Sequence, residues 1–216
     1  MSSARRRMMM KAGGGAPVFY EYLVGDGTAY IDTGMTMPEN GSLAGYFGWE
    51  TARKGSQNLF GAFDVGGGET GIVFGGSTTN SNRQFVAYYD KSSYLKTKTL
   101  SFAYSYYGAF MTPKRFGYGS EATTYTKGSQ RPTATVKVFG GYPTYTSFSG
   151  ALKGDFTIYD STAQNAANYA ALIAFTPVAT FRPCTYNGEA GLWYVEQNRF
   201  LGNAAASGAF TATNTI

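Results

Sequence analysis

The sequence predicts an all-β fold, in which two antiparallel sheets pack as a sandwich behind an extended N-terminal arm. Three observations favour it: aromatic residues make up 17% of the chain, glycine occurs 29 times, and the apolar runs are short and separated by glycine, asparagine and serine. Such statistics are typical of strands and turns. A chain of 216 residues suits one β-sandwich domain. We expect the arm at residues 1–17 and the domain at residues 18–216.

The first half of the domain contains seven segments whose alternation or β-rich composition is typical of strands. They are residues 18–24, 28–34, 43–50, 58–65, 71–76, 84–90 and 99–111. The turn Gly25-Asp26-Gly27 separates the first two, and the run Gly66-Gly67-Gly68 separates the fourth from the fifth. Glycine is favoured in such turns because it adopts backbone angles that other residues avoid.

The second half adds six segments of the same kind, at residues 134–142, 151–160, 181–184, 190–196, 199–202 and 208–212. In the first of them, Thr135, Lys137 and Phe139 alternate with Val136 and Val138, so the two sets are expected on opposite faces. Only residues 162–174 favour a helix. Their alanines support it and their asparagines weaken it, so one or two surface turns are expected.

The N-terminal arm differs in chemistry from the rest of the chain. It contains Arg5, Arg6, Arg7, Met8, Met9, Met10 and Lys11, followed by three consecutive glycines. Such a segment cannot bury enough surface to offset its ordering entropy, so it would not fold alone. Arginine makes forked hydrogen bonds to carboxylates, and methionine fills irregular apolar grooves. We therefore expect these seven residues to bind a partner protein through an acidic, partly apolar socket; a solvated arm with no role is the alternative.

The net charge of +5 is concentrated in this arm, which has four basic residues and no acidic one. The remaining sequence has 14 basic and 13 acidic side chains and is nearly neutral. It presents no basic face for nucleic acid, and four cations alone give weak, salt-sensitive attachment. The continuous apolar stretch of the arm is also too short for a signal peptide. No apolar run in the sequence approaches the roughly 20 residues of a membrane span.

The chain lacks the residues that several catalytic mechanisms require. Histidine is absent, which removes the usual base of serine and cysteine nucleophiles. The single cysteine, Cys184, follows a proline in an apolar strand and is expected to be a buried, unreactive side chain. Neither a disulfide nor a thiolate zinc site can form from one cysteine. We expect no cofactor and no metal site.

Glycoside hydrolysis would need two carboxylates across the scissile bond. Glu189 and Glu196 flank one predicted strand, and Asp155 and Asp160 bracket another. Both pairs have an odd separation, which on an extended strand places the two side chains on opposite faces. The chain is therefore expected not to be an enzyme.

Carbohydrate binding remains open, because sugar faces stack on exposed aromatic rings and the chain has 18 tyrosines, 16 phenylalanines and two tryptophans. Most of these rings are expected in the core, Trp193 among them. The candidates for exposed sugar-binding rings are Trp49, Tyr118, Tyr125, Tyr142 and Tyr145. A calcium site would need clustered oxygen ligands, whereas Asp26, Asp32 and Asp64 are scattered in the sequence.

Three tracts of the predicted domain carry a resemblance to a known family. FYEYLVGDGTAYIDTG (19–34) resembles the first hairpin of concanavalin A-like, laminin-G-like jelly-roll domains that are common in gut phages and bacteria. RPCTYNGEAGLWYVEQNRFLGNAAASGAF (182–210) is similar to the ending of the same domains, and KGDFTIYD (153–160) to the strand before it. The Arg- and Met-rich start is similar to leaders of gut-phage proteins.

The resemblance implies a concanavalin A-like jelly roll in a bacteriophage virion protein, assembled in the host cytoplasm. The arm would anchor it to other capsid or tail proteins, in symmetric copies, and the lectin-like domain would face outward. The alternative is a carbohydrate-binding adhesion module for host or mucosal glycans. A bacterial surface adhesin is a third interpretation, which would require an export route.

Overall fold

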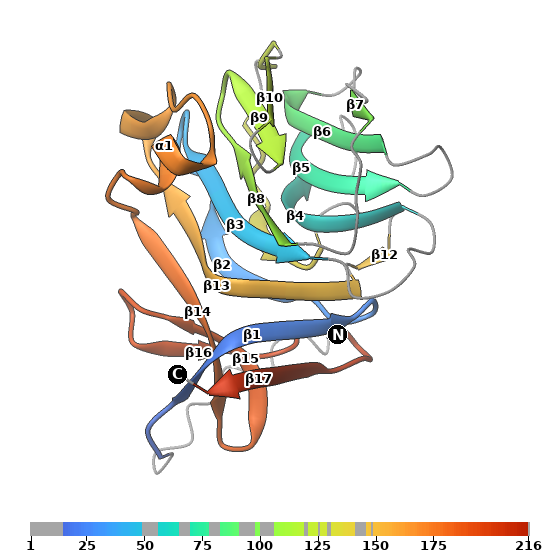
Figure 1. Ribbon diagram of the computed structural model, residues 1–216, viewed down its shortest axis with the longest axis vertical. Coiled ribbons are helices and arrows are strands. Elements are labelled where there is room, and N and C mark those ends of the chain that lie inside the picture. Colours follow the sequence, from blue (N-terminus) through green and yellow to red (C-terminus); the bar gives the residue numbers. More distant parts are fainter. Residues whose placement is uncertain are drawn as a thin grey trace.

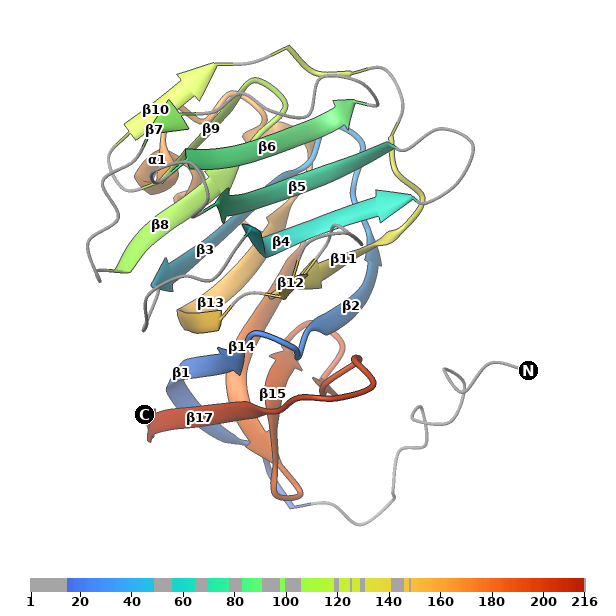
Figure 2. The same cartoon turned by 90° about the vertical axis from the view of Figure 1, so that its right-hand side faces the viewer.

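The computed structural model describes residues 15–48, 56–64, 70–77, 83–90, 98–99, 106–118, 121–124, 126–128, 131–140, 146–147 and 149–215. These residues form an all-β sandwich of two sheets, which face each other in Figure 2. All strand pairs are antiparallel except β12 with β4. The predicted fold class is thereby confirmed.

The larger sheet has the order β10-β9-β8-β3-β13-β1-β14-β15-β16, and β17 pairs with the other edge of β1. Its strands are β1 (Val18–Asp26), β3 (Ser42–Gly48), β8 (Tyr106–Met111), β9 (Arg115–Tyr118), β10 (Glu121–Thr124), β13 (Ser149–Tyr159), β14 (Ala179–Tyr186), β15 (Glu189–Tyr194), β16 (Arg199–Leu201) and β17 (Phe210–Thr215). The sheet forks where β14 pairs with β13 through one half and with β1 through the other.

The smaller sheet has the order β2-β11-β4-β5-β6-β7, with β12 beside β4. Its strands are β2 (Ile31–Thr36), β4 (Ser56–Asp64), β5 (Thr70–Ser77), β6 (Arg83–Asp90), β7 (Lys98–Thr99), β11 (Thr135–Val138) and β12 (Thr146–Ser147).

The core lies between the two sheets and is rich in aromatic rings. Phe47 and Phe156 of the larger sheet meet Phe60 of the smaller one, with ring centroids 5.8 and 5.4 Å from that of Phe60. All three are fully buried. Burial of one such ring contributes roughly 1.5–3 kcal/mol, so the facing aromatic residues are a main source of sandwich stability.

The predicted first hairpin is wrong. β1 and β2 lie in different sheets, so residues 19–34 form a corner that crosses the sandwich. Asp26 holds this corner, because its carboxylate accepts the backbone N–H groups of Thr28 and Ala29 at 2.8 and 3.0 Å and that of Ala209 at 2.7 Å. β1 then pairs with β13, β14 and β17, while β2 pairs with β11.

Phe139 departs from the predicted alternation. Val136 and Val138 are buried as expected, and Thr135 and Lys137 are half-buried. Phe139 has φ of 65° just after β11, and its side chain is fully buried rather than facing outward with Thr135 and Lys137. Its ring centroid lies 5.1 Å from that of Phe210. The gain from burying the ring outweighs the backbone strain of about 1–3 kcal/mol.

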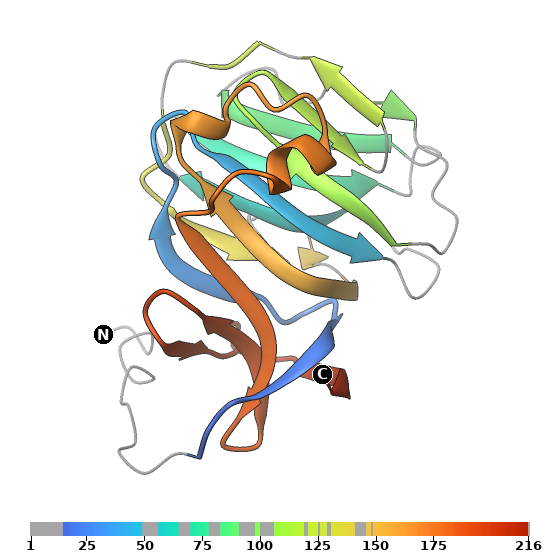
Figure 3. The same cartoon turned by 60° about the vertical axis from the view of Figure 1, so that its left-hand side comes forward.

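The segment after β13 is helical in two short pieces, η2 (Ser161–Ala163) and α1 (Tyr169–Ile173), as the composition of 162–174 predicts. Asp160 and Asn168 accept backbone N–H groups at the two helix starts. Ala163, Ala166 and Leu172 pack on residues of the larger sheet, Ala44, Phe110 and Tyr159. Figure 3 shows this segment lying across the outer face of β3 and β8. Among the described residues, no helix is long and apolar enough to cross a membrane.

Candidate binding site on the outer face of the larger sheet

A row of side chains crosses the outer face of the larger sheet. The strand register aligns Tyr22 of β1, Lys153 of β13, Tyr46 of β3 and Gly108 of β8. Their neighbours Leu23, Leu152, Phe47 and Ala109 are buried in the core between the sheets. Because successive side chains of a strand point to opposite faces, the row faces away from the core.

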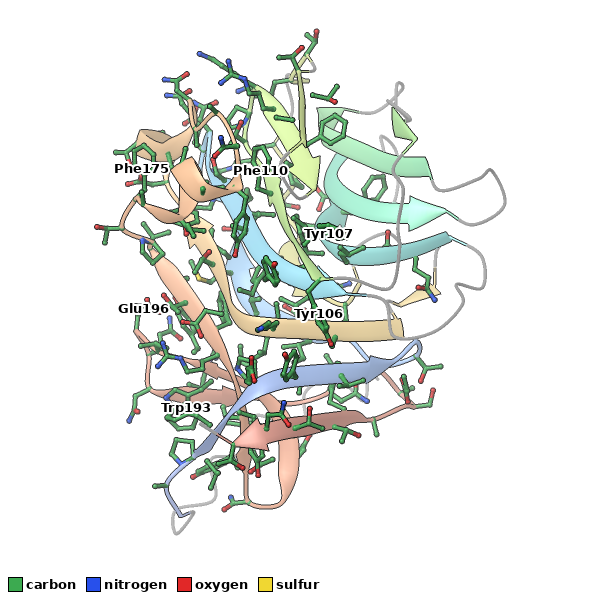
Figure 4. All side chains as sticks on the ribbon, in the orientation of Figure 1. Tyr106, Tyr107, Phe110, Phe175, Trp193 and Glu196 are labelled. Atoms are coloured by element: carbon green, nitrogen blue, oxygen red, sulfur yellow. The ribbon has the colours of Figure 1, made fainter. Side chains whose placement is uncertain are left out.

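Two further tyrosines lie over glycines beside this row. A methyl group at Gly48 would come within 2.7 Å of the Tyr106 ring, and one at Gly108 within 2.3 Å of the Tyr169 ring. The two rings therefore lie directly against the sheet backbone, which only glycine allows. Figure 4 labels Tyr106 at the start of β8, and its neighbour Tyr107 packs instead against the core cluster.

The four rings form two close pairs. The ring centroids of Tyr22 and Tyr106 are 5.3 Å apart, and those of Tyr46 and Tyr169 are 6.0 Å apart. All four side chains are half-buried. We call Tyr22, Tyr46, Tyr106 and Tyr169 with Lys153 the tyrosine platform.

Two ion pairs lie on the platform and at its margin. Lys153 Nζ is 3.1 Å from Glu21 Oε1 and lies 5.5 Å from the centre of the Tyr22 ring. Arg182 donates from Nε and Nη2 to the two oxygens of Asp155 at 2.9 and 2.8 Å. The hydrogen bond to Glu21 raises the pKa of Lys153, and that to Asp155 raises the pKa of Arg182. The positive charges of Lys153 and Arg182 are therefore balanced by the negative charges of Glu21 and Asp155.

Tyr169 brings the helical segment to the platform. Asn168 Oδ1 accepts the N–H of Ala171 at 2.9 Å, which fixes the first turn of α1 and the position of Tyr169 within it. Burial, with the nearby Tyr159, Tyr46 and Asp155, raises the pKa of the Tyr169 phenol to about 12. Its hydroxyl stays protonated at neutral pH and can donate a hydrogen bond.

A second aromatic cluster lies on the outer side of β14, β15 and β16. The centroid of the Tyr186 ring is 5.6 Å from those of Trp193 and of Phe200. The expectation that Trp193 lies in the core is wrong: it is half-buried, because it pairs in register with Arg182 and Phe200 on the face opposite to the buried Leu192 and Tyr194. Figure 4 shows Trp193 on the lower part of the molecule, away from Tyr106.

Cys184 is fully buried, as predicted. Burial raises the pKa of its thiol to about 12, so the thiolate is not available for nucleophilic chemistry at neutral pH.

The carboxylates considered for hydrolysis have separate structural contacts. Asp155 binds Arg182, and Asp160 accepts the N–H of Thr162 at the start of η2. Glu196 accepts the N–H of Thr180 at 2.8 Å, while Glu189 begins β15. Asp155, Asp160 and Glu196 thus each have a hydrogen-bonding role in the fold.

The carboxylates considered for calcium are also engaged with backbone groups. Asp32 accepts the N–H of Gly34 at 2.9 Å, and Asp64 accepts those of Thr133 and Ala134 at 2.7 and 2.6 Å. Asp26 holds the β1–β2 corner. Among the residues that the structure describes, no group of three histidine, cysteine or carboxylate side chains could hold a metal ion.

The candidate residues from the sequence lie almost entirely outside the described residues. This holds for the arm residues and for four of the proposed sugar-binding rings: Arg5, Arg6, Arg7, Met8, Met9, Met10, Lys11, Trp49, Tyr125, Tyr142 and Tyr145. The backbone of Tyr118 ends β9, while its side chain is not described. Sequence reasoning missed the tyrosine platform, although the alternation of Tyr46 with the apolar Phe47 and of Tyr22 with Leu23 was a usable signal.

The sequence matches no family model and no curated protein. The fold is similar to a solved structure described as a mutant of Trypanosoma rangeli sialidase displaying trans-sialidase activity, with a TM-score of 0.42 and 12% sequence identity. The similarity covers 61% of this chain and 22% of that one, so the chain spans about a fifth of the length of that protein. A likeness this distant carries no inference about activity.

Proposed function

We propose that this chain is a non-enzymatic structural protein of a bacteriophage virion, a capsid decoration, head-fibre or tail-associated protein that displays a concanavalin A-like, lectin-like domain. The observation that carries the proposal is the division of the chain into two chemistries. Four of the five net positive charges lie in the arm with its three methionines, and the rest is a nearly neutral β-sandwich. An anchor joined to a displayed domain accounts for both parts.

The place where the sandwich begins supports this arrangement. β1 starts at Val18, which pairs with Thr185 beside the β14–β15 turn. Figures 1 and 2 show that turn at one end of the long axis, and α1 with β9 and β10 towards the other end. A protein held through the residues before Val18 would turn α1, β9 and β10 away from its attachment point.

The chemistry of the arm defines its partner. Arg5, Arg6 and Arg7 suit a carboxylate-lined surface, and Met8, Met9 and Met10 suit an irregular apolar groove. The socket would lie on another virion protein, and the symmetry of a capsid or tail would present it in several copies.

Deletion of residues 2–15 tests the anchor. The shortened protein should keep the folded sandwich, measured by circular dichroism and thermal unfolding, and should be lost from purified particles, measured by immunoblot. Incorporation at the wild-type level would overturn the proposal.

A second function is supported by its own observation. The tyrosine platform presents four rings on the outer face of the larger sheet, with one ion pair on it and a second at its margin. Aromatic rings beside charged and polar groups are the chemistry of a carbohydrate-binding adhesion module. The sandwich would then attach the particle to host or mucosal glycans. A glycan array probed with the fluorescently labelled full chain tests it: specific signals support the module, and an array without signal overturns it.

A further inference from the structure

We infer that the tyrosine platform binds a neutral, extended oligosaccharide that lies across the strands of the larger sheet. This inference rests on the carbohydrate-binding function proposed above and names the ligand class and the site. It replaces the rings suggested by the sequence with Tyr22, Tyr46, Tyr106 and Tyr169.

The spacing of the strands that carry the rings favours an extended chain. Tyr22 and Tyr46 lie on β1 and β3, which are separated only by β13. Two strand spacings amount to about 9–10 Å, which is comparable to the length of a disaccharide unit. Stacking rings carried by backbones at that separation would hold alternate sugars of one chain, with Lys153 between them to donate hydrogen bonds.

The row continues beyond both rings. Thr213 of β17 pairs with Tyr22 and is exposed, so its hydroxyl extends the row at one end. At the other end the Tyr169 ring covers Gly108 and belongs to the α1 segment. The line from β17 through β1, β13 and β3 to α1 defines the path of the ligand across the sheet, which can be followed in Figures 1 and 3.

The charges favour a neutral ligand. Lys153 is paired with Glu21, and Arg182 makes a two-fold contact with Asp155. A sugar carboxylate or sulfate would have to displace Glu21 or Asp155 from its cation and would be repelled by the displaced group. Sugar hydroxyls can instead share these charged groups, since they donate to the carboxylates and accept from the cations.

Titration of the full chain with defined oligosaccharides tests the inference. The probes are cellohexaose, xylohexaose and mannohexaose as neutral chains and hexagalacturonic acid as the acidic one, measured by isothermal titration calorimetry. At least one neutral chain should bind, and the acidic one should bind at least about tenfold more weakly. Tyr22→Ala and Tyr46→Ala should each weaken binding of the neutral chain about tenfold, because each removes one stacking ring.

Three further variants separate stacking from unfolding and from charge. Tyr46→Phe keeps the ring and should stay within about threefold of the wild type. Phe175→Ala removes a ring that is 37% exposed but lies outside the platform, and should leave binding unchanged. Glu21→Gln releases Lys153 from its carboxylate and should strengthen binding of hexagalacturonic acid about tenfold.

Each contrary outcome has a distinct meaning. Neutral chains that bind equally well to Tyr22→Ala and Tyr46→Ala would overturn the site while leaving the carbohydrate-binding function in place. Tighter binding of hexagalacturonic acid to the wild type would overturn the ligand class. Failure of every neutral hexasaccharide to bind would overturn the inference, and the glycan array would then decide the carbohydrate-binding function separately.

Discussion

Asp26 is the residue on which the connection between the two sheets depends. Its carboxylate accepts three backbone N–H groups and the Thr28 hydroxyl, from both the β1–β2 corner and the segment before β17. Burial raises the pKa of Asp26, but these hydrogen bonds outweigh it and hold the pKa at about 2, below the ordinary 3.8. The ionised form is thus the one that the fold stabilises.

Replacing this carboxylate should lower stability and change its pH dependence. Asp26→Asn keeps the shape but loses charge-assisted acceptance, at a cost of about 1–2 kcal/mol in the free energy of unfolding at pH 7. A lowered folded-state pKa gives stabilisation that is present above pH 3.8 and is lost as the pH falls towards about 2. Urea unfolding from pH 7 to pH 2 measures both. A constant difference between wild type and variant across that range would contradict the role of Asp26.

Cys184 should be unreactive in the folded protein. It is fully buried and its thiol pKa is raised to about 12. We expect a thiol reagent such as dithionitrobenzoate to label no cysteine at pH 8 in buffer and one per chain in 6 M guanidinium chloride. Labelling at the same rate in both conditions would show that β14 does not bury this side chain. Cys184→Ala serves as the control without a thiol.

Strands with a clear alternation or a β-rich composition were predictable from the sequence. Strands that form only by pairing with other strands were not. The segments at 43–50 and 58–65 correspond to β3 and β4, with boundaries shifted by a residue or two. β9 and β10 were missed, because their sequences RFGY and EATT have no apolar pattern of their own. They form strands by pairing with β8 and with each other, which a local pattern does not reveal.

The candidate site was less predictable than the fold for a related reason. Tyr22, Tyr46 and Tyr106 lie on three strands that are far apart in the sequence, and only the register of β1, β13, β3 and β8 brings them together. The expectation for Trp193 failed because an apolar run such as that of β15 does not say which face of its sheet is covered. In this case Leu192 and Tyr194 face the core and Trp193 does not.

The contact between α1 and β8 depends on a glycine. A Cβ at Gly108 would lie 2.3 Å from the Tyr169 ring, so Gly108→Ala must displace that ring and with it α1. We expect a loss of about 1–3 kcal/mol in the free energy of unfolding and weaker oligosaccharide binding. In a Tyr169→Ala background, the Gly108→Ala substitution should cost much less of the free energy of unfolding than it costs in the wild type, since the clash is then absent. Thermal unfolding of the four proteins of this cycle checks the coupling, and strictly additive effects would argue against the contact.

At the scale of the whole molecule, the segregation of charge predicts how attachment to a particle should respond to salt and to substitution. If the arm docks in an acidic, partly apolar socket, its cations and its methionines both contribute. Replacing Arg5, Arg6 and Arg7 by glutamine should make attachment weaker and less sensitive to salt. Replacing Met8, Met9 and Met10 by serine should weaken it while leaving the salt dependence intact, because thioether burial is not screened by ions.

A purely electrostatic partner would behave differently. If the arm bound packaged DNA through its four cations, log K would fall with log[salt] at a slope of about −0.9 per phosphate contact, and the serine replacements would have no effect. Release of the protein from purified particles between 0.05 and 1 M NaCl, quantified for wild type and both triple variants, distinguishes the two. For a protein socket, both variants should attach more weakly than the wild type at 0.05 M NaCl. At 1 M NaCl the Debye length of about 3 Å leaves the apolar contacts as the main remaining attraction. Residual attachment is therefore expected there for the wild type and for the arginine variant, and not for the methionine variant.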